Sequence, residues 1–213
     1  GGFYAYEAAK CVGSKGRVCA IEISEEQIKA AEERCAELDW VDFRTANAVE
    51  LPFENAEFDA VFCTQVLEYV PEIERALQEI HRVLRPGGRT LILATNWSSL
   101  VWHSTAPKRM EQVLEAWGEH APFLDLPASL FGRLRQAGFQ PIKQTPVPII
   151  NTSYHENSFS YWIARMIRAF VAGRQMVTEA DADAWLNEFE ELEQKGEYHF
   201  SSTPVITEAV KIA

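Results

Sequence analysis

Residues 17–27 read Arg17-Val18-Cys19-Ala20-Ile21-Glu22-Ile23-Ser24-Glu25-Glu26-Gln27 and set the pattern for the first half of the chain. The short apolar run that closes on Glu22 predicts a buried strand. Ser24 followed three residues later by Gln27 forms a capping box, which predicts a helix from here to about Leu38. A strand that passes so quickly into a helix is one unit of an alternating α/β fold.

The same alternation continues on both sides of this stretch. A short helix is predicted over residues 3–11, and a second long one begins at Pro71 and ends before Pro86-Gly87-Gly88. Apolar runs predict further strands at 41–45, 58–63 and 90–94. Because the connections are short, we expect an α/β fold of the Rossmann-like, doubly wound kind, with a mainly parallel sheet.

The second half of the chain has a different pattern. A helix over 128–137 precedes a strand over 139–147, two helices fill a helical insertion at about 156–196, and a last strand covers 206–212. No linker separates the halves. We expect one domain over residues 1–213 whose parts, 1–96 and 97–213, have different roles.

The charge balance limits the partners that this chain can have. The 213 residues carry 20 Lys and Arg against 31 Asp and Glu, a net charge of −11. Nucleic-acid binders present basic surfaces, so no nucleic-acid partner is expected. No apolar run reaches the roughly 18 residues that a membrane-spanning helix needs, and no secretory leader is visible, so we expect no membrane insertion and a cytoplasmic location.

The cysteines indicate neither a metal centre nor a disulfide framework. Cys11, Cys19, Cys35 and Cys63 show no CxxC spacing, which favours reduced thiols. No His, Asp and Glu cluster has ligand spacing either, so no metal is expected.

Four stretches that occur in order within residues 1–96 carry a family resemblance. They are Gly1-Gly2-Phe3 before a helix, Ala20-Ile21-Glu22-Ile23-Ser24, Ala46–Phe53 followed by Phe58–Val61, and Val66–Val70 followed by Leu84–Arg89. Together they resemble a class I S-adenosylmethionine (SAM) methyltransferase of the quinone-biosynthesis and small-molecule group. The resemblance implies an antiparallel C-terminal strand, extra helices that form a cap, a SAM-binding half over 1–96 and an acceptor-binding half over 97–213.

The resemblance also implies a cofactor-binding set in the first half. The glycine loop would hold the methionine end of SAM, because glycines leave helix N–H groups accessible. Glu22 would accept bonds from the ribose hydroxyls, and Asn47, where the family often has Asp, would accept from the adenine amino group. Gln65 and Val66 would flank the sulfonium. The full set is Gly1, Gly2, Phe3, Glu22, Ile23, Gln27, Asn47, Ala48, Val49, Gln65 and Val66.

One element of the family is missing from the sequence. The family has a central strand before its glycine loop, and this sequence begins inside that loop. The strands at 17–22 and 58–63 would then lack their shared neighbour, so we expect a gap in the sheet. Either an N-terminal stretch has been omitted from the sequence, which we favour, or another chain or segment completes the domain.

The reaction implied is a direct displacement that moves the SAM methyl group to an acceptor and leaves S-adenosylhomocysteine. A base is needed only where the acceptor must lose a proton. His103, just beyond the last strand of the first half, is the predicted base, with His155 and His120 as the other candidates. Aromatic residues predict a pocket for a small aromatic or hydrophobic acceptor; its members are Trp97, Trp102, His103, Tyr154, His155, Tyr161 and Trp162.

Alternatives remain open both for the aromatic residues and for the function. Several of those aromatic residues can instead form a core between the extra helices and the sheet, and the apolar face around Tyr161 suits either a cap or a homodimer contact. The chain can also be a non-catalytic SAM-binding or interaction module of the same fold. A nicotinamide-dependent oxidoreductase is less favoured, because it predicts a complete GxGxxG motif that is absent here.

Overall fold

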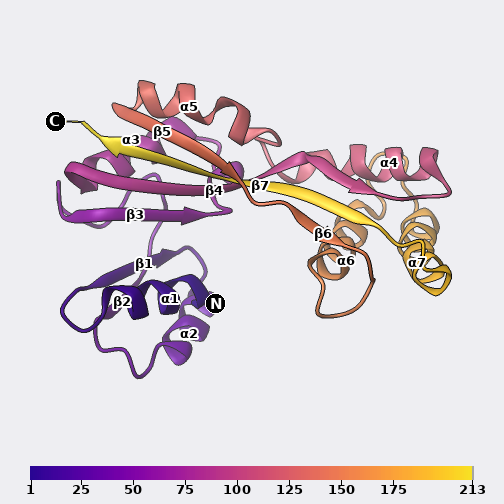
Figure 1. Cartoon of the computed structure of the whole chain (residues 1–213), viewed down its shortest axis with the longest axis horizontal. Coiled ribbons are helices and arrows are strands. Elements are labelled where there is room, and N and C mark those ends of the chain that lie inside the picture. Colours follow the sequence, from indigo (N-terminus) through magenta and orange to yellow (C-terminus); the bar gives the residue numbers. More distant parts are fainter. Residues whose placement is uncertain (213) are drawn as a thin grey trace.

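The computed structural model describes residues 1–212, and its strands form two sheets (Figure 1). The smaller sheet pairs β1 (Val18–Glu22) with β2 (Val41–Thr45) in parallel, in the register Val18 to Val41. The larger sheet has the order β3-β4-β7-β5, and β6 also pairs with β7. Its strands are β3 (Phe58–Thr64), β4 (Leu84–Trp102), β5 (Phe139–Pro146), β6 (Ile149–Asn151) and β7 (Phe200–Lys211).

Strand directions agree with the sequence-based expectation. β3 and β4 are parallel, whereas β7 is antiparallel to β4, β5 and β6. Helices cover the sheets, so the mixed α/β class with an antiparallel C-terminal strand is confirmed. Within residues 1–212, no helix is long and apolar enough to cross a membrane.

The expected gap lies between β1 and β3. β1 pairs only with β2, and β3 pairs only with β4, among the described residues. Side chains from neighbouring segments make contacts across the gap. Arg17, just before β1, pairs with Glu57, just before β3, at 3.5 Å. The ring of Tyr4 in the N-terminal helix meets that of Phe62 on β3 edge to face, with centroids 5.7 Å apart.

The helices follow the expected order with some changes of boundary. Ser24 caps α2 by accepting from the Gln27 N–H at 3.4 Å, as predicted, but α2 ends at Arg34 rather than near Leu38. The chain turns there, and the Leu38 N–H donates to the Cys35 carbonyl at 2.8 Å. The helices are α1 (Phe3–Val12), α2 (Glu25–Arg34), α3 (Ile73–Val83), α4 (Pro107–Trp117), α5 (Leu126–Gln136), α6 (Phe159–Val171) and α7 (Glu179–Lys195), with 3₁₀ turns η1 (Leu67–Tyr69) and η2 (Gly118–His120).

β4 is much longer than the strand predicted over residues 90–94. It continues to Trp102 because β7 supplies a partner from Arg89 to Asn96 and again at Val101 and Trp102, with Trp102 opposite Phe200. The pairing is irregular only between Asn96 and Val101. β4 and β7 thereby extend well beyond the parallel strands and carry α4, α6 and α7 on their outer part (Figure 1).

Two hydrophobic clusters pack against this pair of strands. The sheet core lies under α3 and α5 and includes Leu67, Leu77, Ile92, Leu130 and Phe139. The cap core lies between the outer part of β4 and β7 and helices α4, α6 and α7, and includes Trp97, Trp102, Trp117, Trp185, Phe189 and Phe200. Many of the aromatic residues of the second half therefore stabilise the cap rather than line a pocket.

Candidate functional site

The carboxyl ends of β1, β3 and the first part of β4 face the same side of the molecule. These strands run in the same direction in Figure 1, and the N-terminal end of the chain lies on that side too. Glu22 ends β1, Gln65 follows β3, and Thr95 lies just beyond the part of β4 that pairs with β3. Ligands of open α/β sheets bind at such carboxyl ends, so this edge is the candidate site.

Glu22 is held in place by the loop that follows it. Its Oε1 accepts from the backbone N–H groups of Ile23 at 2.8 Å and Ser24 at 3.2 Å. One carboxylate oxygen is thus tied to the loop while the other can accept a ligand donor. Ile23 itself is 72% exposed, so it can lie over a bound ring.

The Gly1-Gly2 loop packs tightly on α2. Gly2 has φ 76°, and a Cβ atom there would lie 2.7 Å from the Ala31 Cα. A Cβ atom on Gly1 would lie 2.6 Å from the Gln27 carbonyl oxygen. Only glycine fits at both positions. The loop can therefore pack directly against Gln27 and Ala31 of α2. The exposed Phe3 follows the loop and begins α1.

Asn47, Ala48 and Val49 form the turn after β2. The Asn47 Oδ1 accepts from the Val49 N–H at 3.2 Å, an arrangement that Asn often makes in turns. The Ala46 N–H donates to the Glu22 carbonyl at 3.0 Å, which keeps this turn beside the end of β1. Asn47 is exposed, and Ala48 and Val49 pack partly against the sheet core.

Gln65 occupies a strained position at the end of β3. Its φ is 50°, which non-glycine residues adopt rarely and often at functional sites. Two bonds hold it: its N–H donates to the Leu93 carbonyl at 2.7 Å, and its Nε2 donates to the Thr95 Oγ1 at 2.8 Å. Val66 next to it is 42% exposed. Gln65 and Val66 therefore lie at the candidate site.

Glu68 is a site residue that the sequence analysis missed. Its side chain is fully buried, its Oε1 accepts from the Thr95 N–H at 3.1 Å, and its Oε2 has no hydrogen-bond partner among the described residues. Burial raises the pKa of the Glu68 carboxyl, although backbone N–H groups oppose the shift. An acidic residue inside the apolar run Val66–Val70 was the one sequence signal that could have revealed it.

Glu68→Gln is expected to raise the free energy of unfolding at pH 7.5 and to change it little at pH 4. A carboxyl whose pKa is raised on folding contributes stability below its unfolded pKa of about 4.3 and loses it as pH rises. The neutral amide removes that loss. Urea unfolding of both proteins at the two pH values measures the effect, and an equal gain at both would contradict it.

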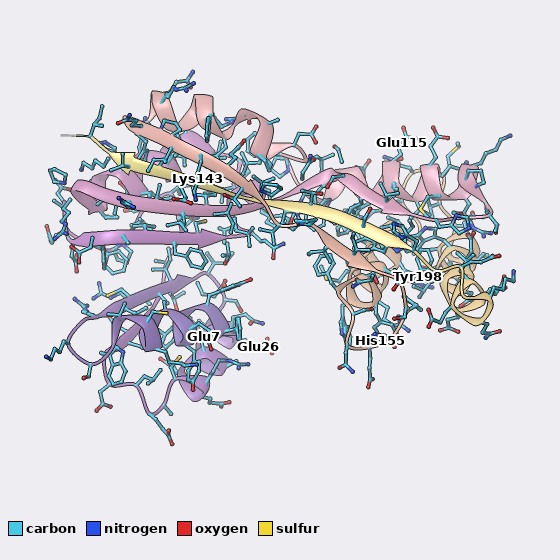
Figure 2. The ribbon with its side chains drawn as sticks, in the orientation of Figure 1. Glu7, Glu26, Glu115, Lys143, His155 and Tyr198 are labelled. Atoms are coloured by element: carbon cyan, nitrogen blue, oxygen red, sulfur yellow. The ribbon has the colours of Figure 1, made fainter. Side chains whose placement is uncertain are left out.

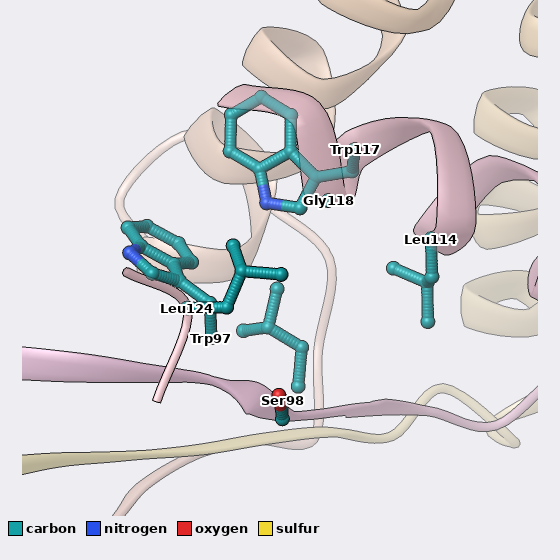
Figure 3. Close-up of a pocket in the computed structure, with 7 residues that line it drawn as sticks. Trp97, Ser98, Leu114, Trp117, Gly118 and Leu124 are labelled. Atoms are coloured by element: carbon teal, nitrogen blue, oxygen red, sulfur yellow. The ribbon is translucent and has the colours of Figure 1, made fainter. Parts of the chain in front are cut away.

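A small aromatic cavity lies beside this edge. Its volume is about 140 Å³, and Trp97, Leu114, Trp117 and Leu124 are among its lining residues (Figure 3). Trp97 follows the end of the inner part of β4, and its N–H donates to the Leu124 carbonyl at 2.9 Å. The cavity therefore lies where α4 and the following loop approach the sheet.

The other predicted acceptor residues do not line this cavity. Trp102 is a cap-core residue that stacks on Phe189 at 5.5 Å and donates from Nε1 to the Tyr198 hydroxyl at 3.1 Å. Tyr154 is also buried there, and its hydroxyl accepts from Arg165 at 2.6 Å. The predicted pocket thus grouped Trp97, which lines the cavity, with Trp102 and Tyr154, which are core residues. The sequence could not separate them, because aromatic residues in a core and in a pocket follow the same pattern.

The remaining four predicted residues lie outside that cavity too. His103 is exposed at the outer end of β4, where its N–H donates to the His199 carbonyl at 3.0 Å. His155 is exposed on the loop after β6 and points away from the sheets (Figure 2). Tyr161 lies under the Arg165 guanidinium at 3.4 Å, and Trp162 is 59% exposed.

The described residues, 1–212, show neither a metal centre nor a disulfide. No group of three or more His, Cys, Asp and Glu side chains could hold a metal ion there. All four cysteines are free thiols, and burial raises the pKa of Cys63 to about 12.

The part of the chain that contains most of this edge is similar to known proteins. Residues 1–92 match the family model described as a methyltransferase domain. Over these residues the chain is similar to that domain family. The demethylmenaquinone methyltransferase of Staphylococcus epidermidis is 36% identical over 92 residues, which are 43% of this chain and 38% of that protein. The chain thus matches well under half of the length of this curated relative.

Solved structures extend the likeness of fold to the whole chain. A structure described as a putative methyltransferase from Bacillus halodurans has a TM-score of 0.69 at 19% identity and covers 100% of this chain and 90% of its own. The [4+2]-cyclase SpnF has a TM-score of 0.61 at 24% identity and covers 100% of this chain and 72% of its own. Both likenesses concern the fold, and the match of residues 1–92 to a methyltransferase domain agrees with the resemblance seen in the sequence.

Proposed function

We propose that this chain is a SAM-dependent methyltransferase that transfers a methyl group to a small aromatic acceptor. The observation that carries the proposal is the grouping of Glu22, Gln65 and the Gly1-Gly2 loop at one edge of a methyltransferase domain. In this proposal residues 1–96 bind the cofactor and residues 97–213 bind the acceptor.

The donor set at the edge suits the cofactor. The uncommitted Glu22 oxygen can accept from ribose hydroxyls, and the first turn of α1 offers N–H groups to a carboxylate. The buried Glu68 carboxyl, with one oxygen unpartnered, suits a neighbouring positive charge. When bound, SAM supplies a methyl group whose bond to sulfur breaks as the acceptor bond forms, leaving S-adenosylhomocysteine.

The chain's own residues would orient the reactants and exclude water. Gln65 is fixed by Thr95 and Leu93, so the backbone at the end of β3 is rigid where the reacting groups would meet. The aromatic cavity between Trp97 and Trp117 supports a flat acceptor. A quinol is one candidate, because curated relatives of residues 1–92 are named demethylmenaquinone methyltransferases. The four free thiols support a reducing, cytoplasmic setting.

Calorimetric titration of the whole chain with SAM and with S-adenosylhomocysteine tests the proposal. We expect saturable binding, and Glu22→Gln should weaken it by about tenfold, because one charge-assisted hydrogen bond to the ribose is lost. Gln keeps an oxygen for the Ile23 and Ser24 N–H groups, so the loop itself is preserved. Glu32→Ala, an exposed acid on α2, is the matched control and should bind as the unaltered chain does.

The outcomes separate the competing functions. Absence of binding by the folded chain would overturn the proposal, and binding of NADH instead would favour an oxidoreductase. Saturable SAM binding without methyl transfer to a panel of phenols and quinols would favour the non-catalytic module. That outcome is a real alternative, because one structure with this fold is named a cyclase and fold alone does not fix a reaction.

A further inference from the structure

The outer face of α6 is apolar although it faces solvent. The helix lies beside β6 and α7, and it buries Ile163 and Ile167 in the cap core (Figure 1). On its opposite side, Trp162 and Met166 are 59% and 57% exposed. These two residues are four positions apart, so they are neighbours on one helix face. A surface helix normally carries polar residues on its outer face, and an apolar one indicates an interaction surface.

The turn that follows α6 exposes a third large apolar side chain. The Gly173 N–H donates to the Val177 carbonyl at 2.9 Å and closes this turn. Gln175 has φ 47°, and Met176 next to it is 80% exposed. Residues 159–177, named the α6 segment below, thus present three large apolar side chains to solvent.

Trp162 is held with its indole N–H already paired. Its Nε1 donates to the Glu156 carbonyl oxygen at 2.7 Å, and its ring meets Tyr161 edge to face with centroids 5.4 Å apart. Covering the exposed ring with an apolar phase therefore leaves no donor without a partner, which would otherwise cost free energy. The Trp162 ring is suited to the boundary between water and hydrocarbon, where tryptophan is enriched.

Arg165 borders this face and offers a free hydrogen-bonding edge. Its guanidinium lies 3.4 Å from the Tyr161 ring centroid. Its Nη1 donates to the Tyr154 hydroxyl at 2.6 Å and to the Tyr161 carbonyl at 3.4 Å. Among the described residues, Nε and Nη2 make no hydrogen bond, so they can donate together to a phosphate.

A second arginine follows the helix. Arg174 lies over the Phe170 ring at 4.2 Å, and its Nε donates to the Phe170 carbonyl at 2.8 Å. Phe170 is four residues after Met166, which places Arg174 beside the apolar face. Within residues 1–212, neither Arg174 nor Arg165 forms an ion pair with an acid. Two cations therefore flank the exposed apolar side chains.

The unpaired charge of the α6 segment is positive, although the chain as a whole carries −11. Residues 157–178 contain three arginines and no Asp or Glu. The third, Arg168, is paired with Glu179 and Asp183 of α7. Glu119, which approaches from η2, accepts from the Gln175 side chain at 2.8 Å. Charges farther away act weakly here, because salt screens them beyond about 8 Å at physiological ionic strength.

We propose that the α6 segment docks on the surface of an anionic lipid bilayer without crossing it. Trp162, Met166 and Met176 would enter the boundary of the hydrocarbon, and Arg165 and Arg174 would bind lipid phosphates. Tryptophan and other apolar side chains beside arginine are the composition of helices that lie on such surfaces. This docking is independent of the proposed activity.

A second copy of the chain fits this face less well. Three side chains cover much less than the roughly 800 Å² that each partner buries in a stable protein interface. A symmetric contact through the face would also bring the arginines of both copies together. The charge of the α6 segment therefore favours an anionic surface over a copy of itself.

Co-sedimentation of the whole chain with lipid vesicles tests the proposal. One set of vesicles contains phosphatidylcholine alone, and the other contains phosphatidylcholine mixed with phosphatidylglycerol. We expect saturable binding to the mixed vesicles that is at least about tenfold tighter than binding to phosphatidylcholine alone, because each arginine near an anionic surface contributes about fivefold. Equal binding to both sets, or no binding to either, overturns the proposal.

Variants locate the docking face. Trp162→Glu should weaken binding to the mixed vesicles at least about tenfold, because it places a charge in the apolar boundary. Ile142→Glu is the matched control: Ile142 is 48% exposed on β5, the change in charge is the same, and binding should be unaltered. Circular dichroism of each variant checks that the fold is kept. Equal losses for the two variants would show that net charge, and not the α6 segment, governs binding.

Arginine variants test the charged part of the face. Arg165→Gln and Arg174→Gln should each weaken binding about fivefold. Arg135→Gln is the matched control, since Arg135 is an exposed arginine over the Phe131 ring at 5.9 Å and should contribute nothing. The same loss in all three variants would contradict docking through α6.

Tryptophan fluorescence provides a direct readout of contact. Lipids with brominated acyl chains should quench the emission of the bound chain, and Trp162→Phe should remove most of this quenching while binding stays within a few fold. Quenching that persists in Trp162→Phe refutes the placement of α6. Self-association that Trp162→Glu abolishes, without vesicle binding, would assign the face to a second copy and overturn the proposal. The vesicle assays contain no SAM, so their failure leaves the proposed function untouched.

Discussion

Trp185→Ala is expected to lower the free energy of unfolding by about 3–5 kcal/mol, the usual cost of truncating a buried tryptophan. The Trp185 side chain is fully buried in the cap core. Its ring centroid lies 4.8 Å from that of Phe189 and 5.7 Å from that of Trp102. Its Nε1 donates to the Met110 sulfur at 3.2 Å. Alanine would leave a large cavity, and the surrounding helices and strand cannot move far enough to fill it.

Urea unfolding followed by far-ultraviolet circular dichroism measures this loss. Trp162→Ala is the matched control, since Trp162 is 59% exposed on α6 and its removal should cost less than about 1 kcal/mol. Similar losses for the two variants would show that the cap core does not contribute to global stability in the way its packing implies.

Glu188→Ala is expected to cost about 3 kcal/mol, because it removes the acceptor from a group of buried donors. Glu188 is 4% exposed. Its carboxylate accepts from the side chains of Ser104 and Thr105 at 2.9 Å each, from the Thr105 N–H at 2.5 Å, and from Arg109 at 3.0 Å. These bonds join the loop after β4 to α7, so their loss should loosen the start of α4.

The effect of Glu188 should depend on pH with a definite sign. Burial by itself would raise the pKa of this carboxyl, but the bonds from Arg109, Ser104 and Thr105 outweigh burial and hold the pKa below its ordinary value. Such a group stabilises the fold above its unfolded pKa of about 4.3 and loses that contribution as pH falls. The difference between Glu188→Ala and the unaltered chain should therefore shrink below pH 4. Glu191→Ala, an exposed acid on α7, should show neither effect.

Local sequence patterns predicted most of the fold because they act over short distances. The apolar run ending at Glu22 and the Ser24 cap are local features, and both occur as expected. The extent of β4 could not be predicted from its own residues. Its outer part is held by β7, which lies about a hundred positions later in the chain, as in the pairing of Trp102 with Phe200.

The candidate site was predictable to the extent that it follows strand ends. Glu22 and Gln65 lie where strands stop, which a sequence can reveal. The role of Glu68 depends on burial by distant segments, and no local pattern reports whether a carboxylate oxygen is left without a donor. Trp97 and Trp102 have the same sequence character, yet only Trp97 lines a cavity.

The central position of β7 has a consequence for how the chain acquires its structure. β7 lies between β4 and β5 and is also the partner of β6, yet it is formed by residues 200–211. During synthesis on the ribosome, β5 and β6 therefore emerge without their pairing partner, and one edge of β4 remains open. Contacts of such long sequence separation form slowly and expose unpaired strands. Assembly of the larger sheet must therefore wait for β7.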